Sequence, residues 1–127
     1  MPHTNEDTLR SLYDALGRGD VPAVLAHLTD DVRYHVTGRS QVSGDYAGKS
    51  EVVGFVGKLM ELSGGTFRVE VLDILANDVH GVVLTRETAQ HDGSVLDNHA
   101  VHVWDMTDGV CSRFRGYNEE AWDRFWQ

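Results

Sequence analysis

The chain of 127 residues has one cysteine, Cys111, and only two prolines. A single cysteine cannot close an internal disulfide, which fits a reducing compartment. No stretch approaches the roughly 18 consecutive apolar residues that a membrane-spanning helix needs. The opening residues, MPHTNEDTL, are polar and acidic, unlike the apolar core of a secretory leader. We therefore expect a cytoplasmic protein that does not enter a membrane.

Basic residues are also scarce. Lys and Arg number 11 against 20 Asp and Glu, which gives a formal net charge of −9. Contact with phosphate groups needs a clustered basic patch, and the basic residues here are scattered. We expect no nucleic acid and no anionic membrane surface as partner. The short motifs CxxC, HExxH, GxSxG and the phosphate loop are absent as well.

Helical spacing of apolar residues dominates the first half of the chain. TNEDTLRSLYDALGRGD predicts a helix capped by Thr4, and DVPAVLAHL predicts a second one capped by Asp20. DVRYHVTGRS predicts a strand, SQVSGDYAG a loop, and KSEVVGFVGKLMEL a third helix with one broad apolar face.

Strands dominate the second half. The segments FRVEVLDILA, GVVLTRETAQH, SVLDNHAVHVWDM and VCSRFRGY are joined by NDVHG, HDGS and MTDG, which have the Asn, Asp and Gly of hairpin turns. The aromatic-rich EEAWDRFWQ follows. Helices before a run of antiparallel strands predict an α+β fold, with helices on one face of a curved sheet. We expect one domain over residues 1–127.

Three segments then point to a family. ALGRGDVPAVLAHLTDDVRYHVTGRS, SGDYAGKSEVVGFVGKL and VHVWDMTDGVCSRFRGYNEEAWDRFW together resemble the SnoaL-like, or ketosteroid-isomerase-like, branch of the nuclear transport factor 2-like superfamily. The resemblance implies a cone: a strongly bent, mostly antiparallel sheet wrapped by three N-terminal helices around an apolar pocket. It also implies a homodimer that pairs through the outer face of the sheet. Because this fold hosts several activities, the function depends on the pocket side chains.

Alternation along each strand assigns side chains to the pocket. In the family pattern the aromatic residue at position 114 faces the cavity. By the same comparison His102 points inward on LDNHAVHVWDM and His99 outward, because residues three apart on a strand lie on opposite faces. The resemblance places His35 where ketosteroid isomerases have their carboxylate base, and our register turns Glu87 inward. The expected substrate-binding residues are Tyr13, Arg39, Tyr46, Phe55, Leu59, Asn98, Trp104, Phe114 and Asn118.

The expected chemistry is proton transfer by histidine. Imidazole titrates near neutral pH, and a carboxylate beside it would hold one tautomer and make it a better base. We therefore assign His35, His102 and Glu87 as candidate catalytic residues. The Asp–Arg–Asp set of limonene-epoxide-hydrolase-like members is missing, since Gly116, Glu87 and Ala89 stand at its positions. The resemblance then implies an isomerase, cyclase or dehydratase that acts on a hydrophobic carbonyl or polyketide-like substrate without a cofactor.

Two alternative functions, and two alternative roles for single residues, remain open. The same cone could bind an apolar ligand without catalysis, or its own side chains could fill it in a purely dimerising module. Glu87 could instead pair with Arg68 or Arg86 on the sheet surface. A metal held by His35, His102 and Glu87 is a minor alternative, and we expect no metal.

Overall fold

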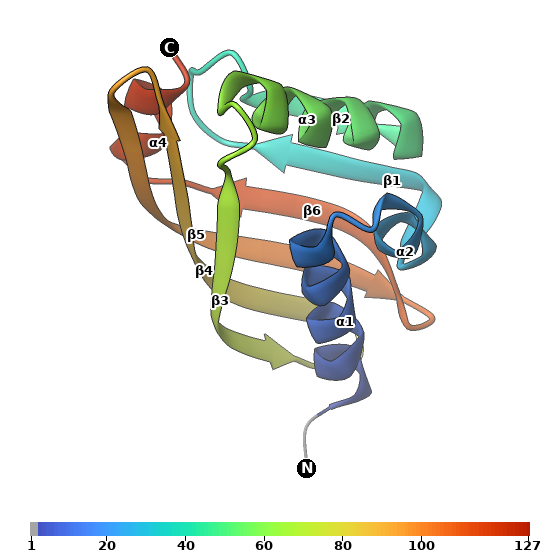
Figure 1. Cartoon of the computed structure of the whole chain (residues 1–127). Helices are drawn as coiled ribbons and strands as arrows, with labels where there is room; N and C mark the ends of the chain where they lie inside the picture. Colours follow the sequence, from blue (N-terminus) through green and yellow to red (C-terminus); the bar gives the residue numbers. More distant parts are fainter. Residues whose placement is uncertain (1–2) are drawn as a thin grey trace.

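The computed structural model describes residues 3–127, and in this part of the chain six strands form one mixed sheet (Figure 1). Their order across the sheet is β2-β1-β6-β5-β4-β3. Strands β1 and β6 run parallel, and the other neighbours run antiparallel. The strands are β1 (Leu28–Val36), β2 (Gly44–Ala47), β3 (Arg68–Ala76), β4 (His80–His91), β5 (Ser94–Thr107) and β6 (Val110–Tyr117).

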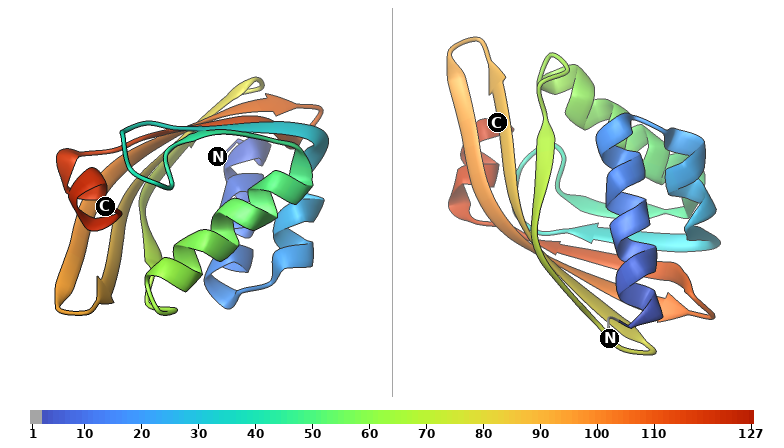
Figure 2. Two further views of the ribbon diagram at one scale, coloured as in Figure 1. Left: turned by 90° about the horizontal axis from the view of Figure 1, so that it is seen from above. Right: turned by 60° about the horizontal axis from the view of Figure 1, so that its bottom comes forward.

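Of the four helices in residues 3–127, three lie on one side of this curved sheet (Figure 2). Helix α1 (Thr4–Arg18) packs on α2 (Val21–Ala26) and β3, whereas α3 (Gly48–Leu62) packs on β1 and β2. A short α4 (Glu120–Phe125) lies against β5. The α+β architecture expected from the sequence is confirmed. None of the helices described is long and apolar enough to cross a membrane.

Local details differ from the sequence prediction at three places. The cap of α1 is His3 rather than Thr4: its ring accepts from the Asn5 N–H, and Glu6 completes the capping box. The predicted loop SQVSGDYAG contains the short edge strand β2. Strand β1 begins at Leu28, earlier than the apolar pattern indicated.

Two tight turns set the register of the long strands. Asp92 and Gly93 between β4 and β5, and Asp108 and Gly109 between β5 and β6, all have positive φ angles of 49° to 82°. Positive φ at both central residues is the geometry of the hairpin turn that matches strand twist, and Asp-Gly favours it. The register that follows pairs Glu87 with Asn98 and Val83 with His102. These pairs share the face of the sheet that the helices cover.

Helix α1 approaches the sheet closely at Gly81 on β4. A Cβ atom placed on Gly81 would lie 2.3 Å from Cδ1 of Leu9, and Leu9 is fully buried. A side chain at position 81 would therefore force the buried Leu9 side chain to repack. Because Tyr13 lies one turn further along α1, this contact also positions Tyr13 over the strands.

We predict that Gly81→Ala lowers the free energy of unfolding by about 1–3 kcal/mol through overpacking. Gly57→Ala is the matched control, because nothing lies within 4 Å of its Cβ position on α3. It should leave stability unchanged or raise it by up to ~1 kcal/mol, since alanine favours helix. Urea denaturation followed by circular dichroism measures both. Equal stability of the two variants would contradict the packing argument.

Candidate active site

Three buried side chains from three elements form one chain of hydrogen bonds. His102 on β5 lies between Tyr13 on α1 and Glu87 on β4. Its Nδ1 is 2.5 Å from the Tyr13 hydroxyl oxygen, and its Nε2 is 3.0 Å from Oε1 of Glu87. Only 2% to 8% of the surface of each residue is exposed. A hydroxyl, an imidazole and a carboxylate in this order are the arrangement that moves protons in a triad.

The direction of the protons follows from the donors available. As a carboxylate, Glu87 can only accept, so Nε2 of neutral His102 carries the hydrogen. Nδ1 is then left as an acceptor, and the Tyr13 O–H donates to it. Glu87 thereby fixes the tautomer of His102 and the orientation of its ring.

Two further side chains extend this network at its ends. The indole N–H of Trp104 donates to the Tyr13 oxygen over 3.1 Å. The Thr85 hydroxyl donates to Oε1 of Glu87 over 3.3 Å. Trp104 therefore donates to Tyr13, Tyr13 donates to His102, and His102 donates to Glu87. Each donor in this chain of hydrogen bonds has an acceptor. We name these five residues the polar network.

Burial decides the ionisation of the phenols. Loss of hydration raises the pKa of Tyr13 well above its ordinary value, although the hydrogen bond from Trp104 opposes the rise. Burial also raises the pKa of Tyr34 on β1. Tyr13 is therefore a neutral hydroxyl near neutral pH, able to give a proton and to take one.

Aromatic rings surround the polar network. Phe114 lies 4.8 Å from His102, 4.7 Å from Trp104 and 4.5 Å from Tyr34 between ring centroids, and Phe55 lies 6.1 Å from Tyr34. These rings occupy much of the space expected to be an open pocket. Each of the residues Tyr13, Tyr34, Phe55, His102 and Phe114 nevertheless keeps 6% to 8% of its surface exposed.

The interior face is least covered at β3. Val69 pairs with Glu87 and Val71 pairs with Thr85, so both valines lie on the same face as the polar network. They are only partly buried, whereas Glu87 and Thr85 beside them are buried. The interior face beside the polar network is therefore partly exposed at the edge strand β3.

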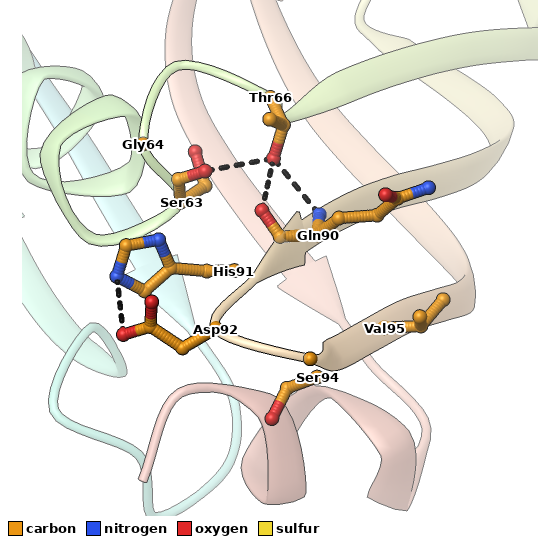
Figure 3. Close-up of a pocket in the computed structure, with 9 residues that line it drawn as sticks. Ser63, Gly64, Thr66, Gln90, His91, Asp92, Ser94 and Val95 are labelled. Atoms are coloured by element: carbon orange, nitrogen blue, oxygen red, sulfur yellow. Dashed lines mark hydrogen bonds and ion pairs between the residues drawn. The ribbon is translucent and has the colours of Figure 1, made fainter.

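Two surface clefts flank the β4–β5 hairpin, away from the polar network. One of about 360 Å³ lies between the end of α3 and the hairpin turn (Figure 3). The other, of about 500 Å³, includes Arg68 and Arg86 of the outer face. In the first cleft His91 and Asp92 form an exposed ion pair at 3.2 Å, and Thr66 binds the backbone of Gln90. Since these contacts stabilise a hairpin, we take the polar network as the candidate site.

Comparison with known proteins gives the family. Residues 9–114 match the SnoaL-like domain. The chain belongs to this family. A protein of Mycobacterium tuberculosis described as uncharacterized is 27% identical over 123 residues, which cover 94% of each chain.

Solved structures of SnoaL-like and related proteins share this architecture. Bal32a from a soil-derived mobile gene cassette is 28% identical, with a TM-score of 0.93 over 98% of this chain and 97% of that one. A Xanthomonas campestris protein of unknown function with a cystatin-like fold is 27% identical, with a TM-score of 0.89 over 99% and 98%. A Jannaschia protein whose description proposes a SnoaL-like polyketide cyclase is 20% identical, with a TM-score of 0.78 over 91% and 85%. The last of these shows the fold alone.

Within this SnoaL-like fold, His102 and Glu87 lie where the alternation predicted. His102 is buried on the interior face, and the His99 side chain is 59% exposed beside Glu119 on the outer face. The alternative surface pairing of Glu87 is wrong, because Glu87 is buried and accepts from His102. Arg86 binds Asp97 instead, and Arg68 binds backbone carbonyls. The sequence placed Trp104 among the substrate-binding residues, and the alternation that turns Glu87 inward also turns Thr85 inward. It carried no signal that either would donate into the polar network.

The predicted interior position of His35 is wrong. Tyr34, not His35, faces the interior of β1, and the His35 side chain is 46% exposed with Nδ1 2.6 Å from Asp45 of β2. A one-residue shift in the sequence comparison is enough to exchange the two faces of a strand. The metal alternative fails for the same reason, and residues 3–127 hold no group of three or more side chains that could bind a metal.

The expected substrate-binding residues separate into three groups. Arg39 is exposed on the loop beside α4, where its backbone N–H donates to Asp123, and its role in substrate binding stays a prediction. Asn98 is fully buried, but its amide already binds Asn118 and the Glu119 N–H. Asn118 belongs with Asn98, because it is partly buried and its amide oxygen accepts from the Asn98 amide. The remaining six lie on the interior side or at its margin: Tyr13, Tyr46, Phe55, Leu59, Trp104 and Phe114.

We predict that stability falls above about pH 10, the ordinary pKa of tyrosine. The raised pKa values of Tyr13 and Tyr34 mean that the unfolded chain releases these protons first, so each residue lowers the unfolding free energy by ~1.4 kcal/mol per pH unit there. Burial also raises the pKa of the Cys111 thiol to about 12, which adds to the same trend.

Urea denaturation between pH 9 and 11 measures this slope. Tyr34→Phe should make the loss of unfolding free energy above pH 10 smaller by ~1.4 kcal/mol per pH unit, the contribution of one tyrosine. Tyr117 is exposed, so Tyr117→Phe should show the same loss as the unmodified protein. A slope that is the same in both variants would show that burial of Tyr34 does not govern alkaline unfolding.

Proposed function

We propose that this SnoaL-like protein is a cofactor-independent acid–base catalyst. It acts on a hydrophobic, carbonyl-bearing small molecule, and its reaction is of the isomerase, cyclase or dehydratase type. The observation that supports the proposal is the buried chain of Tyr13, His102 and Glu87. The description of the Jannaschia relative as a polyketide cyclase agrees with such a substrate.

The first step is removal of a proton from carbon next to the substrate carbonyl. The C–H bond breaks, its proton goes to the Tyr13 oxygen, and the original Tyr13 proton passes to Nδ1 of His102. The substrate becomes an enolate and His102 becomes an imidazolium. The Glu87 carboxylate, 3.0 Å from the other ring nitrogen, balances that positive charge.

The second step returns a proton to a different atom. Tyr13 gives its proton to another carbon or to oxygen of the enolate, and His102 gives its Nδ1 proton back to Tyr13. The network is then neutral at His102 again, and atoms and charge are conserved. A well-placed proton relay of this kind contributes on the order of 10²–10⁴-fold to the rate.

The binding alternative has one observation in its favour. Much of the interior is filled by Trp104, Phe114, Phe55 and Tyr34. Each donor of the polar network also already has an acceptor within the network. A ligand-binding protein needs no free base. The two functions therefore differ in whether the bound ligand exchanges its protons.

We predict that the protein accelerates exchange of the α-hydrogens of 2-tetralone, a bicyclic ketone, with solvent deuterium. Tyr13→Phe and His102→Gln should each reduce the catalysed rate by about 10²–10⁴-fold, since each breaks the relay. Glutamine keeps a polar group at position 102, because an alanine would leave Glu87 buried without its main partner. Proton NMR of the ketone in deuterated buffer follows the exchange.

The matched control is His99→Gln on the outer face of the same strand, which should exchange at the unmodified rate. If the unmodified protein binds 2-tetralone but exchanges it no faster than buffer, the catalytic proposal is wrong and the binding function stands. If His102→Gln and Tyr13→Phe keep the full rate, the relay is wrong.

We also propose that two copies pair through the outer face of the sheet. On this face the register places Leu75 beside Val82 and Val103, and Leu84 beside Val101 and Tyr117. We name these six residues the outer patch. Leu75, Val101 and Tyr117 are 54%, 39% and 46% exposed. A continuous apolar patch on a sheet face favours association.

We predict that Val101→Glu converts a dimer into a monomer, because the carboxylate would have to be desolvated at the centre of the outer patch. Val95→Glu is the control, since Val95 is more exposed, at 70%, but lies at the hairpin end of β5 outside the patch. Sedimentation velocity gives the mass of each. A dimer that persists in Val101→Glu, or a monomeric unmodified protein, would reject this interface.

A further inference from the structure

We infer that Trp104 is a positioning residue: its indole N–H makes Tyr13 release its proton toward the ligand once His102 carries a charge. The inference rests on the proposed function, because it concerns the same relay. It goes further by assigning a task to a side chain that the sequence places only in the pocket wall.

The geometry gives Trp104 one role toward Tyr13. Its Nε1 lies 3.1 Å from the Tyr13 oxygen, and the two rings are perpendicular with centroids 6.2 Å apart. The indole is 2% exposed, so water does not compete for its N–H. An indole N–H donates and never accepts. The Tyr13 oxygen therefore accepts from Trp104 in every protonation state of the network.

The second fixed partner appears when His102 is protonated. Both ring nitrogens then donate, Nε2 to Glu87 and Nδ1 to the Tyr13 oxygen. The Tyr13 oxygen now accepts from Trp104 and from His102, and its own hydrogen can point at neither. It must point away from both, toward whatever lies over the network. The donor that faced His102 in the resting state thus becomes a donor to the ligand.

Glu87 is the one charged group among the titratable side chains described around His102. The titratable side chains around the network are Glu87 on β4, Tyr13 on α1, Tyr34 on β1 and Cys111 on β6. Burial keeps the pKa of each phenol and of the thiol high, so these three stay neutral near pH 7. Glu87 is therefore the counter-ion of His102 whenever His102 is protonated.

Trp104 also supports the oxygen while the proton moves. As Tyr13 passes its proton to His102, negative charge grows on the oxygen, and the indole N–H already points there. The hydrogen bond from Trp104 lowers the pKa of Tyr13, which also means that it favours negative charge on this oxygen. A phenylalanine at position 104 would keep an aromatic wall and remove only this donor and part of the ring.

The chain supplies a matched control. Trp122 on α4 is also 2% exposed, but its indole nitrogen has no hydrogen-bond partner among the residues described. Trp122→Phe therefore makes the same chemical change in a buried site without breaking a hydrogen bond. The two variants separate loss of the N–H donor from loss of tryptophan volume.

The test compares Trp104→Phe with Trp122→Phe in two measurements. In 2-tetralone exchange, Trp104→Phe should lower kcat by about 10²-fold, as removal of a donor to a developing oxyanion does, with KM within twofold. Trp122→Phe should change neither. In protein labelled at the tyrosine Cζ carbons, the Tyr13 Cζ chemical shift at neutral pH, which reports the hydrogen bonds to its oxygen, should change in Trp104→Phe and stay in place in Trp122→Phe.

The two measurements distinguish the possible failures. The Tyr13 chemical shift at neutral pH needs no turnover, so it tests the Trp104 contact even if 2-tetralone is not exchanged and the proposed function is wrong. An unchanged Tyr13 chemical shift in Trp104→Phe would overturn the inference. So would an equal loss of kcat in the two variants, or a loss confined to KM.

Discussion

A buried carboxylate on the concave face of the sheet determines the rest of this site. Glu87 is 2% exposed, and a charge removed from water is costly unless donors surround it. His102 and Thr85 supply those donors from the neighbouring strand and from two residues away. Once Glu87 accepts from Nε2, the remaining hydrogen positions follow through Tyr13 to Trp104. The placement of one acid thereby orders five side chains from three elements.

The sequence predicted the fold, and it also predicted the part of the site on β4 and β5, because these two strands are long and regular. Their Asp-Gly turn fixes the pairing, so one correctly assigned residue places all the others, and Glu87, Asn98 and His102 follow. The predicted site residue on β1 had no hairpin turn to fix its register. Strand β1 has a register irregularity between Leu28 and Arg33 against its parallel partner β6, and its family comparison was off by one residue. That shift exchanged Tyr34 with His35.

The contents of the interior were harder to predict than its lining. Alternation tells which side chains face inward, but it cannot tell whether aromatic rings leave a chamber or pack against one another. Here Phe114 contacts Trp104, Tyr34 and His102 at once. The hydrogen bonds of Trp104 and Thr85 likewise depend on rotamers and on helix placement, which a pattern of residue types does not contain. A chain of polar groups inside an aromatic enclosure strengthens each hydrogen bond, because the surroundings screen charge weakly.

The contact between Leu9 and Gly81 links the packing of helix α1 to the geometry of the polar network. It limits how closely α1 approaches β4, because the leucine side chain lies directly against the backbone of Gly81. The separation of the phenol and the imidazole is then set by packing one helical turn away, where no reacting atom lies. A change in the volume of Leu9 would therefore be expected to alter the contact between the phenol and the imidazole, with every polar group left in place.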